Sequence, residues 1–322
     1  MRWTTRKKCC FASVFLRLNN VKGLLDIESL ERGEIEAVLD RARFFQPPPN
    51  ETYRRLSVLQ GKTVVNLFFE ASTRTRVSFE IAARRLGAET ITIAAQGSSV
   101  SKGESLVDTL NTLAAMRPHA IVMRHGASGA PRFLARHLQI PIVNAGDGTH
   151  EHPTQALLDA RTILDHRPSL TGLRVAIIGD IAHSRVARSN VHLLSKFGAE
   201  IVLCGPPSLL PRELEQLAPG VRLAWNMTEA IQGADVIMML RVQLERQHEA
   251  PMAASEYFRF YGLRLEHLEH AKPDVIVMHP GPINRGRELS SEVADSQRSV
   301  ILNQVENGVA VRMAVLERVL GA

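Results

Sequence analysis

The stretch FFEASTRTRVSFE, residues 68–80, marks the point where a predicted buried strand gives way to a helix. The apolar run VVNLFF leads into it, and an amphipathic pattern continues from it to Gly87. This order is typical of a βα unit in a parallel sheet. Arg74 and Arg76 stand at the expected helix start, where cations oppose the helix macrodipole unless an anion is bound. The stretch therefore predicts both an α/β fold and a site for an anion.

Apolar runs alternate with helical patterns along the rest of the chain, which predicts parallel sheets built from βαβ units. The predicted strands span residues 63–69, 89–94, 120–124, 141–144, 174–179, 200–204, 221–225, 235–240 and 274–278. So many strands suit two sheets better than one, and we place the boundary in the helix that follows Pro153. The first and last predicted helices span 29–45 and 303–320. The expected fold class is α/β with two doubly wound domains, each a parallel β-sheet flanked by helices.

The bulk composition is that of an ordinary globular protein, with 322 residues of which 45% are apolar and 22% charged. No apolar run approaches the ~20 residues needed to span a bilayer. The net charge of +6 arises within residues 1–22, which contain six basic residues and no acid. Because the rest of the chain is balanced, the positive charge is weak support for nucleic-acid binding.

Residues 1–22 form a basic extension that we expect to be disordered or to act as an organelle-targeting segment. Its apolar stretch CCFASVFL is short, is followed at once by Arg17, and leads to no clear cleavage site of a secretory signal. Cys9 and Cys10 are adjacent in this segment, and the third cysteine is Cys204. The three cysteines imply no disulfide framework and favour a reducing, cytoplasmic compartment.

Cationic or amide-bearing side chains follow most of the predicted strands. Parallel α/β sheets bind ligands beyond the carboxyl ends of their strands. The segments at these ends are STRT (72–75), SK (101–102), Arg124, HEHPTQ (150–155), HSR (183–185), RVQ (241–243) and HPGP (279–282). Their recurrence at one edge of both sheets predicts a cleft that binds anions.

The segment STRTR, residues 72–76, is the first candidate site. The first turn of a helix has free N–H groups and a partial positive charge, so a phosphate there receives several hydrogen bonds. The hydroxyl groups add donors, and Arg74 can bind two phosphate oxygens with its planar guanidinium group. The alternative is that Ser72 is a simple N-cap and that the arginines are solvated.

The segment GDGTHEHPTQALLD, residues 146–159, is the second candidate site. Pro153 fits the first helical position, which puts His152 at the helix entrance and Gln155 in the first turn. These two side chains could donate hydrogen bonds to a ligand oxygen. Two alternatives stay open: a metal site that uses His150 and His152 with Asp147, and a loop histidine at the surface.

The segment VAIIGDIAHSRVARS, residues 175–189, occupies the place of a dinucleotide-binding loop. It lacks the second and third glycines that let a backbone approach a pyrophosphate, which disfavours a nicotinamide cofactor. Arg185, near the start of the following helix, fits a carboxylate or phosphate partner. The alternative is that it is an ordinary surface arginine.

Two loops complete the set of candidates. In MLRVQLER, Arg241 and Gln243 point the same way just past a strand if the chain stays extended. A solvated loop is the alternative there. The Gly/Ser-rich loop GSSVSKGES has Lys102 near its tip and could close as a lid on an anion, or serve only as a linker.

Taken in this order, the motifs closely resemble those of the aspartate carbamoyltransferase catalytic chains over residues 25–320. FFEASTRTRVSFE and HPTQALLD resemble segments that all transcarbamoylases share. SSVSKGESLVDTL, GDIAHSRVARS, MLRVQLER and MHPGPINRGRE are similar to segments of the aspartate enzymes in particular. The H-C-L-P segment and the S-M-G loop typical of the ornithine enzymes are absent from the sequence.

The resemblance implies a role for each matched residue. The implied carbamoyl phosphate site consists of Ser72, Thr73, Arg74, Thr75, Arg124, His152, Gln155 and the backbone at Gly281 and Pro282. The implied L-aspartate site consists of Lys102, Arg185, Arg241 and Gln243. Lys102 would come from a neighbouring subunit, because the family is built on homotrimers with shared active sites.

The resemblance also implies how the chain divides. Residues 23–153 together with 302–322 would form the carbamoyl phosphate-binding domain, with the C-terminal helix packing back on it. Residues 154–301 would form the L-aspartate-binding domain. A regulatory or dihydroorotase-like subunit is a possible partner, whereas no nucleic acid, membrane, metal or cofactor is implied.

The implied reaction is carbamoyl transfer from carbamoyl phosphate to the amine of L-aspartate, an early step of pyrimidine biosynthesis. Thr75, Arg124 and His152 would stabilise the oxyanion that forms, and Arg74 would hold the phosphate. We expect direct attack without a covalent enzyme intermediate, because no Ser-His-Asp or Cys-His pair stands at convincing spacing.

Three other functions remain as alternatives at this point. The first is a transcarbamoylase that uses another amine, such as ornithine. The second is a metal hydrolase that uses His150, His152 and His279. The third is a binding or structural subunit without catalysis, which is disfavoured because competent residues fill every matched position.

Overall fold

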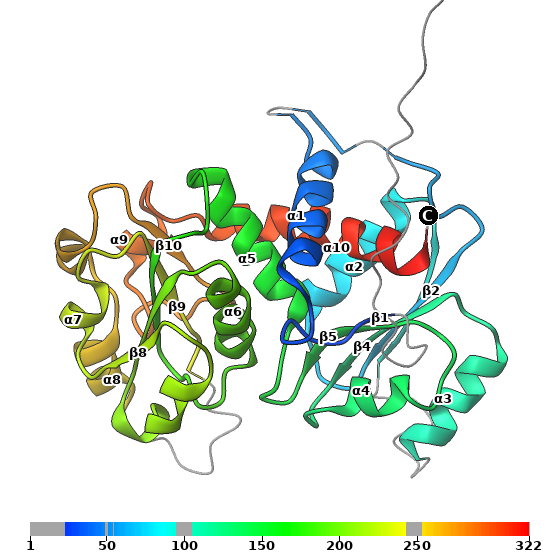
Figure 1. Cartoon of the computed structure of the whole chain (residues 1–322), viewed down its shortest axis with the longest axis horizontal. Coiled ribbons are helices and arrows are strands. Elements are labelled where there is room, and N and C mark those ends of the chain that lie inside the picture. The colour runs from blue at the N-terminus through cyan, green and yellow to red at the C-terminus, as the bar shows by residue number, and fades with distance from the viewer. Residues whose placement is uncertain (1–22, 49–50, 54, 95–104, 243–252, 322) are drawn as a thin grey trace, which may run out of the picture.

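The structure is a computed structural model that describes residues 23–48, 51–53, 55–94, 105–242 and 253–321. Two lobes lie side by side, and each contains one five-stranded parallel sheet with helices around it (Figure 1). The predicted fold class is therefore confirmed. The extension 1–22 and the candidate residues Lys102 and Gln243 lie outside the described residues.

In the first sheet, the direction in which the chain adds strands reverses between β2 and β4. Its strands are β1 (Gly23–Leu24), β2 (Thr63–Phe68), β3 (Glu89–Ala94), β4 (Ala120–His125) and β5 (Ile142–Asp147), in the spatial order β1-β5-β4-β2-β3. All neighbouring strands are parallel. The chain builds outward from β2 to β3 and then returns to β4 on the other side, which makes the β2/β4 gap the switch point where ligands bind in such sheets.

The second sheet has its own switch point, between β6 and β9. Its strands are β6 (Arg174–Ile178), β7 (Glu200–Cys204), β8 (Val221–Ala224), β9 (Val236–Met239) and β10 (Ile276–Met278), in the order β10-β9-β6-β7-β8. These pairs are also all parallel. The residues that follow β6 and β9 therefore leave the sheet side by side.

All nine predicted strands are present, with ends that differ by at most three residues. The sequence did not reveal β1, because a strand of two residues carries no readable periodicity. The first helix, α1 (Arg32–Phe45), begins three residues later than predicted. Its start is fixed by the Glu34 carboxylate, which accepts a 2.9 Å hydrogen bond from the backbone N–H of Glu31.

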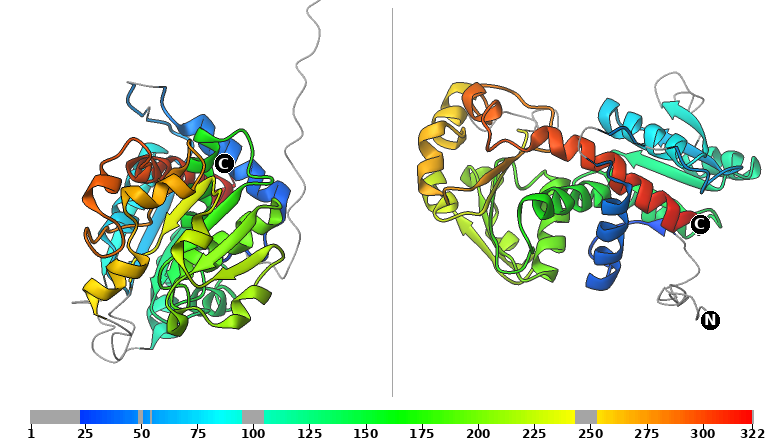
Figure 2. Two further views of the ribbon diagram at one scale, coloured as in Figure 1. Left: turned by 90° about the vertical axis from the view of Figure 1, so that its left-hand side faces the viewer. Right: turned by 90° about the horizontal axis from the view of Figure 1, so that it is seen from above.

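Two long helices, α5 (Pro153–His166) and α10 (Ile301–Leu320), join the lobes. The helices are α1 and α2 (Thr73–Arg85), α3 (Leu106–Ala115), α4 (Ala130–Ala135), α5 (Pro153–His166), α6 (Arg185–Lys196), α7 (Met227–Ile231), α8 (Ala254–Tyr261), α9 (Ser291–Ala294) and α10 (Ile301–Leu320), with short 3-10 turns at Pro207–Leu209, Arg212–Gln216 and Leu265–His270. Helix α10 starts at the second lobe and runs back over the first, where it contacts α1, α2 and α5 (Figure 2). The predicted return of the C-terminal helix is thus confirmed.

The largest apolar core is continuous between the lobes. It contains side chains of both sheets, such as Val64 and Ile177, together with α5 and α10. Each sheet has a smaller core on its other face. Helix α5 is buried from Pro153 to Ile163, so it serves as a shared structural element and not as a surface linker.

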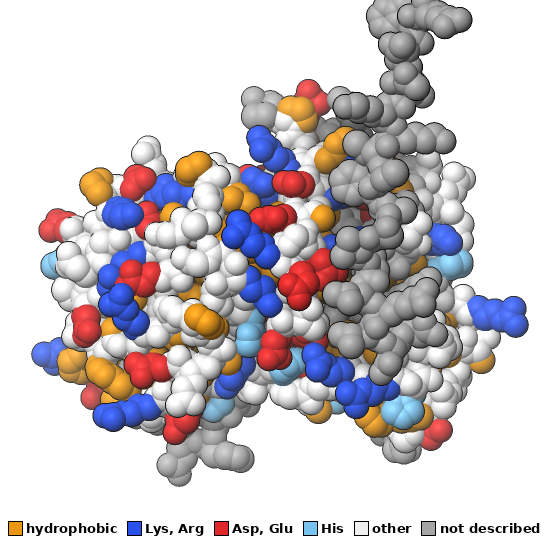
Figure 3. All heavy atoms as spheres, viewed as in Figure 1, with side chains coloured by type: hydrophobic (Ala, Val, Ile, Leu, Met, Phe, Trp, Pro, Cys, Tyr) orange, Lys and Arg blue, Asp and Glu red, His pale blue; other side chains and the backbone are white. Residues whose placement is uncertain are grey.

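Charges of both signs are interspersed on the face of the molecule shown in Figure 3. This agrees with the near-neutral balance of the chain outside residues 1–22. Among the helices of the described residues, none combines the length and the apolar character that a bilayer crossing needs.

We predict that Leu316→Ala in α10 lowers the free energy of unfolding by about 2–5 kcal/mol, because Leu316 is fully buried in the shared core and its loss leaves a cavity. Urea denaturation followed by circular dichroism measures the change. Leu302→Ala is the matched control, since Leu302 lies on the same helix but is 82% exposed. Equal effects of the two substitutions would contradict the proposed role of α10.

Candidate functional site

The turn between β2 and α2 presents a helix N-terminus without a cap. Ser72 occupies the N-cap position, but its side chain accepts no bond from the helix backbone. Its Oγ instead donates to Thr75 Oγ1 at 3.0 Å. No acid stands in the first turn of α2. The simple N-cap alternative therefore does not describe this turn, and the first N–H groups of α2 remain available to an anion.

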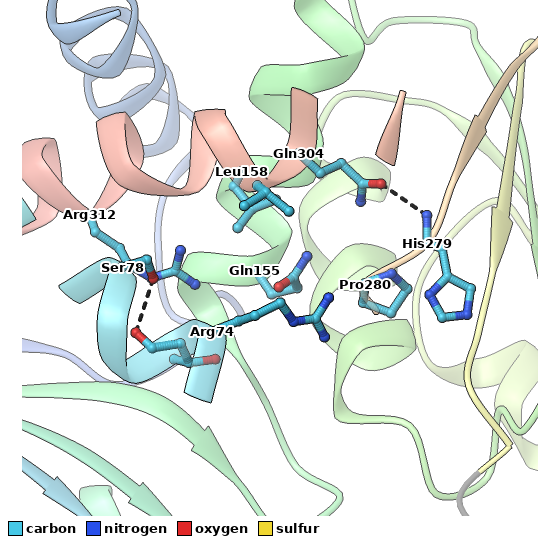
Figure 4. Close-up of a pocket in the computed structure, with 10 residues that line it drawn as sticks. Arg74, Ser78, Gln155, Leu158, His279, Pro280, Gln304 and Arg312 are labelled. Carbon is cyan, nitrogen blue, oxygen red and sulfur yellow. Dashed lines mark hydrogen bonds between the residues drawn. The ribbon is translucent and has the colours of Figure 1, made fainter. Parts of the chain in front are cut away.

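Arg74 extends from α2 to the loop after β10 in the other lobe (Figure 4). Its guanidinium group lies against Gly281, where a Cβ atom would overlap Nη1 of the arginine. Arg74 makes no hydrogen bond or ion pair with any part of the chain that the structure describes. Its pKa is lowered by partial burial and by the nearby cation of Arg241. Both effects are those expected of a side chain placed for an anionic ligand.

A cavity of about 50 Å³ lies between the lobes beside Arg74. Figure 4 shows side chains of α2, α5 and α10 converging on it from one side and the loop after β10 from the other. Its lining comprises Arg74, Thr75, Ser78, Gln155, Leu158, His279, Pro280, Gln304, Val305 and Arg312. The candidate site is thus built from both lobes, and neither sheet forms it alone.

Glu70 links the two switch points. Arg124 lies near the carboxyl end of β4, at the first switch point, and its Nη2 donates to Glu70 Oε1 at 2.5 Å. Arg185 opens α6 in the second lobe, and its Nη1 donates to Glu70 Oε2 at 3.2 Å, while Nη2 pairs with Oε1. Arg185 is only 4% exposed, so the alternative of a surface arginine is wrong. Gly146 separates the two guanidinium groups, since a Cβ there would lie 3.0 Å from Arg185 and 3.1 Å from Arg124.

His152 stands at the start of α5 as an uncharged imidazole. Its backbone N–H donates to Ser189 Oγ at 2.8 Å, and its Nδ1 is buried without a partner in the described structure. Burial, followed by the charges of Arg124, Arg185 and Arg312, holds the pKa of His152 well below its usual value of 6.5. A neutral imidazole in a cationic pocket can donate one hydrogen bond without exchanging a proton with the ligand.

Gln155 lies one turn further along α5. Its Nε2 donates to the buried Asp159 carboxylate at 2.9 Å, and the residue lines the cavity. The pKa of Asp159 is raised to about 6 by burial, which hydrogen bonds from Asn190, Gln304 and Gln155 oppose.

Two residues that the sequence analysis did not single out belong to the site. Glu70 stood within the quoted opening stretch, but nothing in its local sequence indicated two arginine partners. Arg312 lies in the apolar segment GVAVRMAVL of α10, and burial lowers its pKa to about 9. A lone arginine on a buried helical face was the available signal for Arg312, because such residues are rarely buried without a purpose.

Two histidines of the metal alternative, His150 and His279, each have a ring nitrogen engaged by a neighbouring group of the chain. His150 Nδ1 lies 3.1 Å from Asp147 Oδ2, and His279 Nδ1 accepts a 2.7 Å hydrogen bond from the backbone N–H of Gly281. Burial, with the charges of Arg74 and Arg241, lowers the pKa of His279 to about 3. In the described part of the chain, no three His, Cys, Asp or Glu side chains are grouped closely enough to hold a metal ion.

Comparisons with known proteins agree with this geometry. Residues 22–165 match the family described as "Aspartate/ornithine carbamoyltransferase, carbamoyl-P binding domain", and residues 171–319 match "Aspartate/ornithine carbamoyltransferase, Asp/Orn binding domain". The aspartate carbamoyltransferase catalytic subunit of Solibacter usitatus is 77% identical over 93% of this chain and 99% of that protein.

Solved structures resemble this chain at lower sequence identity. The ornithine carbamoyltransferase of Pyrococcus furiosus has a TM-score of 0.85 at 31% identity, covering 94% of this chain and 98% of that one. The aspartate transcarbamoylase of Trypanosoma cruzi, in complex with N-(phosphonacetyl)-L-aspartic acid, has a TM-score of 0.84 at 33% identity, covering 92% and 95%. The backbone alone thus does not separate aspartate from ornithine enzymes.

We predict opposite protonation of two neighbouring histidines at about pH 6. The pKa of His150 is raised by its hydrogen bond to Asp147, so this ring should be charged, whereas His152 should stay neutral. Because the folded-state pKa of His152 lies below the unfolded value, its contribution to stability is lost as the pH falls below about 6.5. Histidine-selective NMR, with His150→Gln and His152→Gln for assignment, measures both rings. A charged His152 at this pH would refute the site geometry.

We predict that Gly281→Ala weakens the binding of inorganic phosphate by roughly tenfold or more. The added Cβ would overlap the Arg74 guanidinium group and displace it, and a charge-assisted hydrogen bond is worth about 1.5–3 kcal/mol. Isothermal titration with phosphate measures the change. Gly286→Ala is the matched control, because Gly286 has a similar positive φ of 76° but nothing within 4 Å of its Cβ position. Comparable losses in both variants would show backbone strain and not displacement of Arg74.

Proposed function

The chain belongs to the aspartate/ornithine carbamoyltransferase family, and we propose that it is the catalytic chain of an aspartate carbamoyltransferase. It transfers the carbamoyl group of carbamoyl phosphate to the amine of L-aspartate, which gives N-carbamoyl-L-aspartate and phosphate. The observation that carries the proposal is the convergence of arginines from two switch points on one cleft. The carboxylate of Glu70 pairs there with both Arg124 and Arg185. High identity to catalytic subunits of this name supports aspartate over ornithine.

The carbamoyl phosphate site is proposed at the first switch point. The uncapped N-terminus of α2 would receive the phosphate, with the side chains of Ser72, Thr73, Arg74 and Thr75 as further donors. Arg124, His152 and Gln155 would surround the carbamoyl end. The backbone at Gly281 and Pro282 would contact its amine. This arrangement places the phosphate dianion where the arginines otherwise repel one another.

The L-aspartate site is proposed at the second switch point. Arg185 and Arg241 would bind the two carboxylates as charge-assisted pairs. Lys102 and Gln243 would complete it, with Lys102 contributed by a neighbouring subunit. Glu70 holds Arg185 in its present position, so an incoming carboxylate would share or replace that partner.

The proposed chemistry is direct attack of the neutral amine on the carbonyl carbon. A C–N bond forms, the C–O bond to phosphate breaks, and the amine loses one proton, which the departing phosphate can accept. Thr75, Arg124 and His152 would donate hydrogen bonds to the oxyanion, each worth about 2.7–4 kcal/mol of barrier. The low pKa of His152 supports a role as an aimed donor and not as a general base. Holding both anions in one geometry supplies much of the remaining rate enhancement.

The same proposal covers the roles of the two domains and the assembly of the chain. Residues 23–153 and 302–322 would bind carbamoyl phosphate, and residues 154–301 would bind L-aspartate. The active unit would be a cytoplasmic homotrimer, alone or with a regulatory or dihydroorotase-like subunit. Analytical ultracentrifugation of the full chain tests the trimer.

The activity test is formation of carbamoyl-aspartate from the two substrates by the purified full chain. L-ornithine and other primary amines serve as competing acceptors in parallel reactions. Carbamoyl transfer is expected with L-aspartate as the acceptor and with none of the other amines. A preference for ornithine, or for an amine without a side-chain carboxylate, would overturn the aspartate assignment.

We predict that Arg241→Ala raises the KM for L-aspartate by roughly ten- to a hundredfold, because a charge-assisted hydrogen bond is worth about 1.5–3 kcal/mol. The KM for carbamoyl phosphate should change much less. Steady-state kinetics with each substrate varied in turn measures both values. Arg222→Ala is the control, since Arg222 lies on the edge strand β8, away from the switch point, with 68% of its side chain exposed. An unchanged KM for L-aspartate in Arg241→Ala would contradict the assignment.

A further inference from the structure

Asp159 is a fully buried carboxylate that the proposed mechanism does not use. It lies on α5, one turn beyond Gln155, with no exposed surface. Three side-chain amides donate to it: Gln155 Nε2 at 2.9 Å and Gln304 Nε2 at 2.7 Å reach Oδ1, and Asn190 Nδ2 at 2.8 Å reaches Oδ2. These donors come from α5, α10 and α6, so the carboxylate sits where both lobes meet.

A carboxylate that only accepts hydrogen bonds fixes the orientation of the amides around it. Because Gln155 Nε2 is turned toward Asp159, its oxygen is directed away from the carboxylate. Gln155 and Arg74 line the same cavity (Figure 4). Gln155 therefore offers the cavity a hydrogen-bond acceptor, whereas Arg74 and Arg312, the charged side chains of its lining, are donors.

The same oxygen of Asp159 also controls a second acceptor. Gln304 Nε2 is held by Asp159 Oδ1, which leaves Gln304 Oε1 to accept a 2.9 Å hydrogen bond from the backbone N–H of His279 (Figure 4). This bond fixes the start of the HPGP turn, residues 279–282, against α10. His279 and Pro280 line the cavity, so this bond holds the turn at the cavity wall.

We propose that Asp159 is a positioning residue that makes the site selective for a carbamoyl amine, by orienting both the Gln155 amide and, through Gln304, the HPGP turn. The inference rests on the proposed function. A carbamoyl NH₂ group carries two N–H donors and needs acceptors, which arginines and helix N–H groups cannot supply. Without Asp159, Gln155 could turn its NH₂ group toward the ligand, and the turn would lose its anchor.

A purely structural role is the competing explanation, because the three amides also join α5, α6 and α10. Asn190 separates the two explanations. It donates to Oδ2 of the same carboxylate and to the backbone oxygen of Val186, and among the described residues no hydrogen bond joins it to Gln155 or to the HPGP turn. Asn190→Ala therefore also removes a hydrogen bond from the Asp159 carboxylate, but it leaves the amides of Gln155 and Gln304 bonded to it.

The experiment compares carbamoyl phosphate with acetyl phosphate, which has a methyl group in place of the amine. The selectivity ratio is the competitive inhibition constant of acetyl phosphate divided by the KM of carbamoyl phosphate, both measured with the full chain at saturating L-aspartate. Asp159→Ala is expected to lower this ratio by roughly three- to tenfold, the worth of one lost neutral hydrogen bond. Asn190→Ala is expected to leave the ratio unchanged, even where it lowers thermal stability. Gln155→Ala should lower the ratio as Asp159→Ala does.

Each outcome decides between the two explanations. Equal weakening of both ligands in Asp159→Ala, or an equal fall of the ratio in Asn190→Ala, would overturn the proposal. If Asp159→Ala does not fold, Gln304→Ala decides, since it severs the anchor of the turn, and an unchanged ratio there would also overturn it. If the wild-type chain transfers no carbamoyl group to L-aspartate, the proposed function is refuted. Binding of acetyl phosphate and carbamoyl phosphate, measured by calorimetry without turnover, still tests the role of Asp159 in that case.

Discussion

The structure depends on how it compensates the repulsion among the cations that gather at two facing sheet edges. Arg74, Arg124, Arg185, Arg241 and Arg312 all approach the cleft, and Arg241 and Arg312 act on the pKa values of other groups there. Like charges at such distances oppose folding unless carboxylates or ligand anions lie between them. Among the described residues, the Glu70 carboxylate pairs with Arg185 and the Asp159 carboxylate acts on the charge of Arg312. The remaining positive field is available to bind anions.

This field also determines the chemistry open to the histidines. Burial and several nearby guanidinium groups lower the pKa values of His152 and His279, whereas the hydrogen bond to Asp147 raises the pKa of His150. The sequence HEH places two of these rings two residues apart, yet the fold gives them opposite behaviour. A neutral donor cannot compete with substrate for a proton at neutral pH, which suits a reaction whose attacking amine must itself be unprotonated.

The sequence was informative where a residue's role follows from its immediate neighbours. The strands, the helix start within STRTR and the placement of His152 before Pro153 are local features, and the structure has them as predicted, with strand ends that differ by at most three residues. Glu70 and Asp159 could not be assigned in this way, because each has a partner on another element more than a hundred residues away: Arg185 for Glu70 and Gln304 for Asp159. Arg312 stood out only as a lone arginine in an apolar segment. Strand β1 escaped notice because its pairing with β5 is non-local and its length is too short for a pattern. Charge compensation between elements is therefore what the sequence did not disclose.

The half-buried Glu70 and the fully buried Asp159 answer two different needs of one cleft. Arginines and helix N–H groups select for negative charge, but charge alone would admit any phosphate together with any dicarboxylate. Discrimination between an amine and a methyl group requires hydrogen-bond acceptors, and a site rejects an analogue best when its own buried polar groups would be left unpaired. Acceptors are scarce in a cationic cleft, because every nearby donor competes to turn them away from the ligand. A carboxylate buried behind the glutamines resolves this competition, since it accepts their N–H groups and leaves their oxygens for other partners.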